Sequence, residues 1–230
     1  MILVEDKLIY IHIPKTGGVS IEDFLLNHYG CKRSIFTLTD GVIPLPINAK
    51  NMGWTYYPCM HLPLPSLIKT CSEYNIDNNW KIFSIVRNPY YKFISELFYT
   101  TPTGLCYNYH TLPVGQKEML VNQSIDYYFE NLDNINNYHS AHSYPQYKFF
   151  ENSPINCQIY KFEEGLKNVM VKLGYEVKDF PHRMNIFKER RVPKPDYREV
   201  LTPYLVETIN NRYAKDFEIF GYEMLDPLDI

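Results

Sequence analysis

The sequence contains no long hydrophobic run, and no stretch approaches the roughly 18 apolar residues that a bilayer-spanning helix needs. It also has no surplus of charge, since 23 Lys and Arg face 26 Asp and Glu, a net charge of -3. Glu5 and Asp6 stand where a signal peptide would carry positive charge. We therefore expect a cytoplasmic chain with no membrane span and no nucleic-acid partner, in which any anion site is local.

Cysteine is sparse and is not arranged for metal or disulfide chemistry. The five cysteines form no C-x-x-C pair, and their odd number leaves at least one unpaired. This usage favours a reduced compartment, with the thiols as small core residues. His139 and His142 lie close together, but no third ligand stands near them, so we expect no metal.

Two common nucleotide motifs are missing. No Gly-Lys dipeptide occurs anywhere in the chain, which excludes the G-x-x-x-x-G-K-[ST] loop of typical ATPases and GTPases. No G-x-G-x-x-G occurs either, which disfavours a dinucleotide fold. A nucleotide site in this chain would have to be built differently.

Strand-like and helix-like stretches alternate along the 230 residues, 45% of which are hydrophobic. This alternation predicts an α/β fold, a single domain over residues 1–230 with a central parallel sheet flanked by helices. The sequence between 31 and 60 is expected to form short strands and loops, and 196–223 one long helix or two short ones. The strands are expected at 7–13, 81–87 and 157–162, and the other helices at 19–30, 62–74, 90–99 and 163–174.

The most informative segment is HIPKTGGVS, residues 12–20, where a strand ends and a helix begins at once. Glycines at a helix start expose successive backbone N–H groups, which together with the helix dipole form a cradle for an anion. Lys15 beside Gly17 and Gly18 favours phosphate binding. The alternative is a tight turn in which the glycines only supply unusual φ angles.

The second informative segment is IVRNPYYKFIS, where Arg87 closes a strand and Ser95 follows inside the next helix. A guanidinium is a planar, permanently charged fork that suits phosphate oxygens, and a hydroxyl can complete such a site. The pair could hold a second phosphate. The alternative makes Arg87 a salt-bridge partner at the sheet edge and Ser95 an ordinary helix residue.

Together the two segments resemble the donor-binding signatures of sulfotransferases that use 3′-phosphoadenosine 5′-phosphosulfate (PAPS), especially the carbohydrate 2-O-sulfotransferase branch. Weaker similarities are His61, the His142-x-x-Pro145-Gln146 stretch and YKFEEGLKNVMVKLG. The resemblance implies a P-loop nucleotide-binding-like sulfotransferase fold, with Arg87 and Ser95 on the 3′-phosphate. The 5′-phosphosulfate would be held by Lys15, Thr16, Gly17, Gly18, Val19 and Ser20. Val19 departs from the family, which commonly has Thr at this position.

Two catalytic roles follow from the chemistry of sulfuryl transfer, which needs charge stabilisation on the leaving phosphate and a base for the acceptor. Lys15 is the candidate for the bridging oxygen. His61 is the candidate base, because histidine titrates near neutrality and a strand-like run, 54–60, precedes it. Glu22 is an alternative base, whereas His12 is expected in the core.

The sequence thus predicts a PAPS-dependent O-sulfotransferase that needs no metal, releases adenosine 3′,5′-bisphosphate and acts on a hydroxyl of a carbohydrate or another small molecule. A basic stretch, 182–198, could add contacts to the donor or acceptor through Lys188, Arg190 and Arg191. Two rival functions use the same loop. One is a nucleotide-dependent kinase or hydrolase, and the other is a non-catalytic nucleotide-binding relative.

Overall fold

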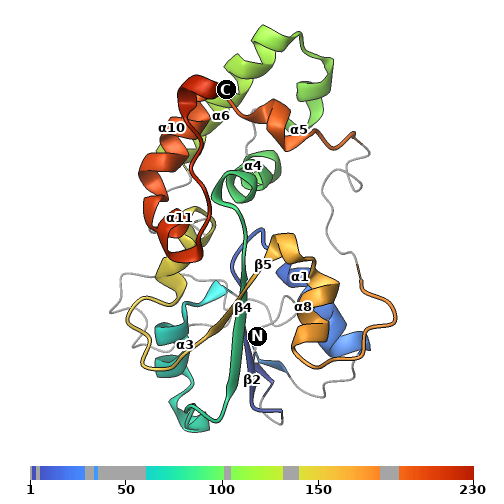
Figure 1. Ribbon diagram of the computed structural model, residues 1–230, viewed down its shortest axis with the longest axis vertical. Coiled ribbons are helices and arrows are strands. Elements are labelled where there is room, and N and C mark those ends of the chain that lie inside the picture. The colour runs from blue at the N-terminus through green and yellow to red at the C-terminus, as the bar shows by residue number, and fades with distance from the viewer. Residues whose placement is uncertain are drawn as a thin grey trace. The chain divides into compact units, whose positions relative to one another are not determined.

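The computed structural model describes residues 2–3, 6–28, 34–35, 61–100, 105–131, 140–181 and 192–230. The chain divides into a first unit, residues 1–87 and 135–183, and a second unit, residues 88–134 and 184–230. Figure 1 shows the strands in the first unit and long helices in the second. The assignment of all 230 residues to one domain stays a prediction.

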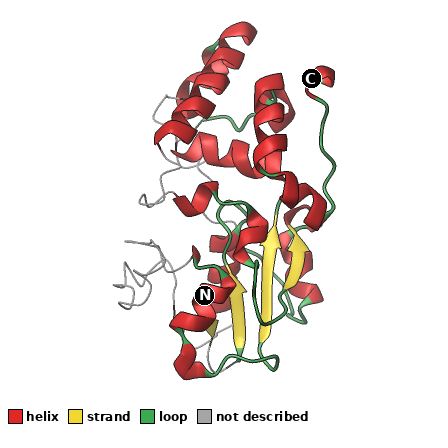
Figure 2. Ribbon diagram, turned by 90° about the vertical axis from the view of Figure 1, so that its left-hand side faces the viewer, coloured by secondary structure: helices red, strands yellow, loops and turns green. Residues whose placement is uncertain are grey.

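The first unit is built on a five-stranded sheet in the order β3-β1-β2-β4-β5. The central strands β2, β4 and β5 are parallel, whereas β1 pairs antiparallel with both β2 and β3. Figure 2 shows the strands side by side. Their bounds are β1 Ile2–Leu3, β2 Leu8–Ile11, β3 Ser34–Ile35, β4 Lys81–Val86 and β5 Gln158–Lys161.

The sheet confirms the α/β class and all three predicted strands, with one correction to the direction of its strands. The prediction of a parallel sheet holds for β2, β4 and β5, but β1 makes the sheet mixed. The reason is the chain length between β1 and β2, which is enough for a hairpin and too short for the crossover that parallel strands need.

Helices cover both faces of this sheet. In Figure 1, α1 and α8 lie on one side and α3 lies on the other. The core between the sheet and the helices α1 and α8 includes Tyr10, Phe83 and Ile85 from the strands and Phe24 and Met170 from the helical elements. The helical elements of this unit are α1 Gly18–Asp23 with its π-helical continuation η1 Phe24–His28, α3 Leu64–Thr70, η3 Ser72–Tyr74, α7 Ser140–Ser143, η5 Gln146–Phe149, η6 Phe162–Glu164 and α8 Leu166–Lys172.

The described part of the second unit is helical. Its core is formed by the apolar faces of α4, α6 and α10, with Phe93, Ile125 and Leu205 among the buried residues. Its elements are α4 Pro89–Thr100, α5 Leu105–Asn108, η4 Tyr109–Thr111, α6 Val114–Asn131, η7 Tyr197–Val200, α10 Pro203–Arg212, α11 Ala214–Phe220 and η8 Pro227–Asp229.

Local sequence signals explain where these helices begin. The Asn88 side chain accepts hydrogen bonds from the backbone N–H groups of Tyr90 (3.0 Å) and Tyr91 (3.4 Å), so it caps α4. Thr202 caps α10 in the same way by accepting from Leu205 N at 3.0 Å. Capping oxygens of this kind satisfy N–H groups that have no partner inside the helix. The segment 196–223 therefore forms separate helices, the second of the two predicted outcomes.

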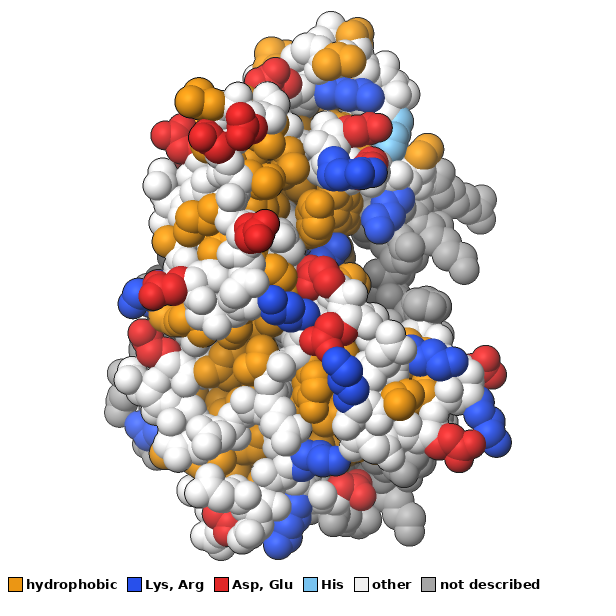
Figure 3. All heavy atoms as spheres, viewed as in Figure 1, with side chains coloured by type: hydrophobic (Ala, Val, Ile, Leu, Met, Phe, Trp, Pro, Cys, Tyr) orange, Lys and Arg blue, Asp and Glu red, His pale blue; other side chains and the backbone are white. Residues whose placement is uncertain are grey.

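No helix of the described residues has both the length and the apolar composition needed to cross a bilayer. On the face drawn in Figure 3, acidic and basic side chains are interspersed. Such a surface has no strong field of one sign, as the net charge of -3 implies. Most of the predicted strands and loops at 31–60 lie outside the described residues.

Candidate functional site

The site is centred on the turn that joins β2 to α1. Lys15 (φ 64°) and Gly17 (φ 83°) both adopt left-handed backbone conformations. Gly17 O accepts hydrogen bonds from Ser20 N (3.0 Å) and Ile21 N (3.3 Å), which makes Gly17 the first residue before the helix. Gly17 has no side chain with which to cap this helix start. Its first N–H groups are therefore available to an anion.

Close packing leaves little room for a side chain at either glycine, and the backbone conformation of Gly17 favours glycine as well. A Cβ atom on Gly17 would lie 2.6 Å from Leu166 Cδ1 and 3.1 Å from Phe162 Cε2. A Cβ atom on Gly18 would lie 2.1 Å from the ring of His12. The tight-turn interpretation is thus correct for Gly17, and it is compatible with anion binding, because the same turn presents the helix start.

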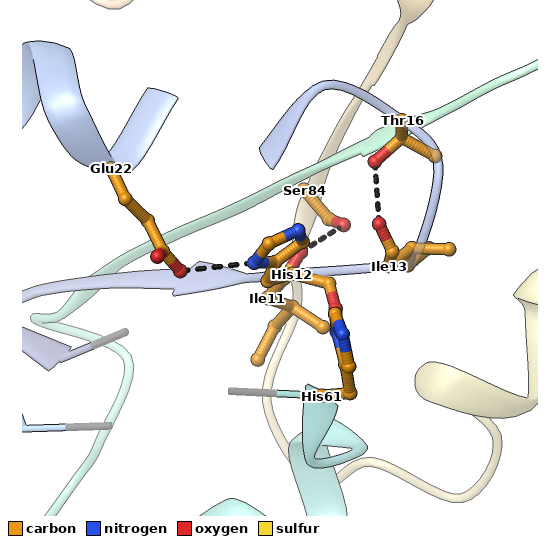
Figure 4. A network of polar contacts seen from close by, with 7 residues as sticks. All are labelled: Ile11, His12, Ile13, Thr16, Glu22, His61 and Ser84. Atoms are coloured by element: carbon orange, nitrogen blue, oxygen red, sulfur yellow. Dashed lines mark hydrogen bonds and ion pairs between the residues drawn. The ribbon is translucent and has the colours of Figure 1, made fainter. Parts of the chain in front are cut away.

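His12 lies directly beneath this turn and supports it, as Figure 4 shows. Its Nδ1 atom is 3.0 Å from Glu22 Oε1, and both side chains are buried. Thr16 donates a hydrogen bond to Ile13 O at 2.8 Å, which closes the turn from the other side. His12 is a core residue, as predicted. Glu22, the alternative base, contacts His12 from α1, and its catalytic role stays a prediction.

His61 lies beside His12 and is held by the backbone of β2's end. Its Nδ1 atom is 2.8 Å from His12 O (Figure 4). A carbonyl oxygen can only accept, so Nδ1 carries the hydrogen, and the lone pair of the neutral ring is on Nε2. Burial lowers the pKa of His61 well below 6.5, and the neighbouring His12 and His142 lower it further. His61 is therefore neutral at pH 7, as a general base must be.

The strand predicted before His61, residues 54–60, lies outside the described residues. Tertiary contacts fix the ring instead. Its centroid is 4.6 Å from that of His12 and 5.2 Å from that of His142, both in edge-to-face geometry. In the described part of the chain, these histidines and their neighbours form no group arranged to hold a metal ion.

Arg87 follows β4 and reaches the turn after β2. Its Nη1 atom donates to Lys15 O at 3.1 Å, and its guanidinium carbon lies 4.5 Å from the centroid of the Phe162 ring. β2 and β4 are adjacent and parallel, so their carboxyl ends meet at one edge of the sheet. The two predicted phosphate-binding loops are therefore in direct contact through Arg87 and Lys15.

Of the remaining predicted site residues, the structure describes Ser95 but not the three cations of the basic stretch. Ser95 is a partly exposed residue of α4 in the second unit, and its part in the site stays a prediction. The three cations of the basic stretch that were predicted to contact donor or acceptor lie outside the described residues: Lys188, Arg190 and Arg191.

Sequence reasoning did not identify the neighbours of Arg87. Gln146 is fully buried and bonds to the Arg87 main chain, and Phe162 lies against both its guanidinium and Gly17. The Pro145-Gln146 pair was visible as part of a resemblance, but nothing local in the sequence distinguishes Gln146 from a solvent-exposed glutamine.

A parallel strand followed by a glycine turn and a helix start, with an arginine from the neighbouring strand, is typical of α/β proteins that bind phosphorylated nucleotides. A comparison with family models matches residues 1–223 to the sulfotransferase family, and the chain belongs to that family. Comparisons with curated proteins and with solved structures find no match. The protein is thus a transferase of sulfuryl groups, and its family generally uses PAPS.

Proposed function

We propose that this protein transfers a sulfuryl group from PAPS to a hydroxyl of a carbohydrate, as in the 2-O-sulfotransferase branch that its signatures resemble, or of another small molecule. The observation that supports this most directly is the hydrogen bond between Arg87 Nη1 and Lys15 O, 3.1 Å. It joins two cationic loops at one sheet edge, and PAPS carries phosphate groups on both sides of its ribose.

The residues at this edge fit such a donor. The uncapped start of α1 and the ammonium of Lys15 suit the 5′-phosphosulfate, together with Thr16, Val19 and Ser20 of the same turn. The Arg87 guanidinium suits the 3′-phosphate, with Ser95 as the predicted second contact. When bound, PAPS supplies the sulfuryl group and the phosphate that leaves.

The chain's own residues then have two tasks. Lys15 stabilises the negative charge that develops on the bridging oxygen as the sulfur–oxygen bond to the phosphate breaks. His61 Nε2 takes the proton of the acceptor hydroxyl as the new sulfur–oxygen bond forms. His12 holds His61 in the required tautomer through its carbonyl oxygen, 2.8 Å from Nδ1. The products are the sulfated acceptor and adenosine 3′,5′-bisphosphate.

We expect adenosine 3′,5′-bisphosphate to raise the melting temperature of the protein more than ADP or AMP at equal concentration. A ligand that binds only the folded state stabilises it in proportion to its affinity. In Arg87→Ala, adenosine 3′,5′-bisphosphate should lose about 10- to 100-fold in affinity, because hydrogen bonds to a charged group are removed. AMP should be affected much less.

Arg212→Ala is the matched control for Arg87→Ala. Arg212 lies over the Phe129 ring at 4.5 Å, the same kind of contact that Arg87 makes with Phe162, but it is exposed on α10. The control should keep the preference for the 3′-phosphate.

Equal stabilisation of the wild-type protein by all three nucleotides would contradict the proposal, and metal-dependent ATP turnover would favour the kinase or hydrolase. Failure to transfer radiolabelled sulfate from PAPS to a mixed acceptor pool would favour the non-catalytic relative.

The pH profile should reflect the lowered pKa of His61. The base is active when neutral, so kcat/KM should fall as the pH falls through the pKa of His61 in the free enzyme. Because burial sets that pKa well below 6.5, the acidic limb should also lie well below pH 6.5. Initial rates at subsaturating donor, measured from pH 4.5 upward at constant ionic strength, test this expectation. An acidic limb at or above pH 6.5 would argue for another base.

A further inference from the structure

The Gln146 side chain forms hydrogen bonds with the Arg87 backbone, as the backbone of a residue on a neighbouring strand would. Its Oε1 atom accepts a hydrogen bond from Arg87 N at 2.9 Å, and its Nε2 atom donates to Arg87 O at 2.8 Å. The glutamine side chain is fully buried. One side-chain amide thus satisfies both main-chain polar groups of a single residue.

This pairing occurs where the sheet's own hydrogen bonding ends. The last residue pair between β4 and β5 is Val86 with Lys161, and β5 then turns into η6, which begins at Phe162. On the other side of β4, the last pair with β2 is Ser84 with Ile11. Buried backbone N–H and C=O groups need partners. Gln146 supplies them for Arg87, one residue beyond the ladder.

Because Gln146 holds the Arg87 main chain, the Cα atom from which the Arg87 side chain extends is also held in place. From that origin the guanidinium reaches Lys15 O at 3.1 Å and lies 4.5 Å from the Phe162 ring centroid. An arginine that is already oriented loses less conformational freedom when it binds an anion. The Gln146 contact with the main chain should therefore affect how strongly Arg87 favours a nucleotide with a 3′-phosphate over one without it.

We propose that Gln146 is a specificity-determining positioning residue, which sets the preference for a 3′-phosphorylated nucleotide by holding Arg87 at the end of β4. This inference rests on the proposed function of Arg87. Gln146 is fully buried and both ends of its amide bond to the Arg87 main chain, so its proposed effect acts through Arg87. Its effect is confined to the one phosphate that Arg87 contacts, while the 5′-phosphate is bound by the Lys15 turn.

Two variants of Gln146 test the proposal. Gln146→Leu has a similar size and removes both hydrogen bonds. Gln146→Glu keeps an oxygen that accepts from Arg87 N, but it turns a second carboxylate oxygen toward Arg87 O, which has no hydrogen to donate. The measurement is the dissociation constant of adenosine 3′,5′-bisphosphate and of AMP, by calorimetry on the full chain.

The expected result is a fall in the ratio of the two affinities. In Gln146→Leu the preference for adenosine 3′,5′-bisphosphate over AMP should drop by about 10- to 100-fold, as it would if the Arg87 contact itself were weakened. Gln146→Glu should lower the ratio as well, because its buried carboxylate oxygen faces Arg87 O without a hydrogen to share, and AMP affinity should stay close to wild type in both. Gln116→Leu, the same change on the exposed first turn of α6, should leave the ratio unchanged.

The proposal is overturned if Gln146→Leu weakens both nucleotides by the same factor, which is what a general structural role predicts. If Gln146→Leu does not fold, the ratio in Gln146→Glu decides, and an unchanged ratio overturns the proposal. A wild-type protein that binds both nucleotides equally overturns the proposed function, and this inference with it. A selective wild type with unchanged ratios in both variants overturns only the role of Gln146.

Discussion

Gly18→Ala is expected to abolish donor binding and to destabilise the fold by about 3 kcal/mol, the upper end of the range for overpacked cores. The new methyl group would lie 2.1 Å from the His12 ring, a distance that no Cβ atom tolerates. The ring has little room to move, because Glu22 holds its Nδ1 at 3.0 Å and the side chain is buried. Chemical unfolding and nucleotide-induced stabilisation measure the two effects.

Gly115→Ala is the control for Gly18→Ala. Gly115 lies on the exposed first turn of α6, and a Cβ atom there would meet nothing within 4 Å. The substitution should be neutral or stabilising by up to about 0.5–1 kcal/mol, since alanine loses less conformational freedom in a helix than glycine. If Gly18→Ala were as stable as Gly115→Ala and bound adenosine 3′,5′-bisphosphate normally, this would contradict the close contact of the His12 ring with Gly18.

His61→Asn is expected to lower kcat by about 10²- to 10⁴-fold while leaving the affinity for adenosine 3′,5′-bisphosphate unchanged. An asparagine amide can still donate a hydrogen bond toward His12 O, which His61 Nδ1 contacts at 2.8 Å. It offers no basic nitrogen in place of Nε2. The variant thus removes the proposed base but keeps the local contact, and single-turnover rates at saturating donor measure its effect.

The comparison for His61→Asn is His110→Asn, the same change at a histidine of η4 in the second unit. It should leave kcat within experimental error of wild type. Near-normal turnover of His61→Asn at saturating donor would remove His61 from the role of general base. A large loss in nucleotide affinity would instead assign it to the binding of the donor.

The local features of the fold could be predicted because they depend on residues close together in the chain. The buried strand at 81–86 follows from a run of β-branched and aromatic residues. The start of α4 follows from the Asn88-Pro89 pair, and the turn at Gly17 from its need for positive φ. The antiparallel strand β1, which lies between β3 and β2, was not predicted, because two residues are too few to show a pattern.

The meeting of the two loops could also be predicted, though less directly. Lys15 and Arg87 each follow a strand, and adjacent parallel strands place their carboxyl ends at one edge. That these two strands are neighbours was an expectation, and the parallel pairing of β2 with β4 establishes it. The supporting contacts were not predictable: Gln146 is 59 residues from Arg87, and His61 is 49 residues from His12.

The amino-acid pattern was thus enough to propose which groups carry the chemistry: a lysine and two glycines at a helix start, an arginine after a strand, and a histidine. Folding alone selected what holds them in place, including the His12 ring under Gly18 and the Gln146 amide on Arg87. The physical reason is that a backbone conformation or helix cap is set by a few neighbouring residues. Burial and pairing of a polar side chain are instead set by whichever distant segments pack around it.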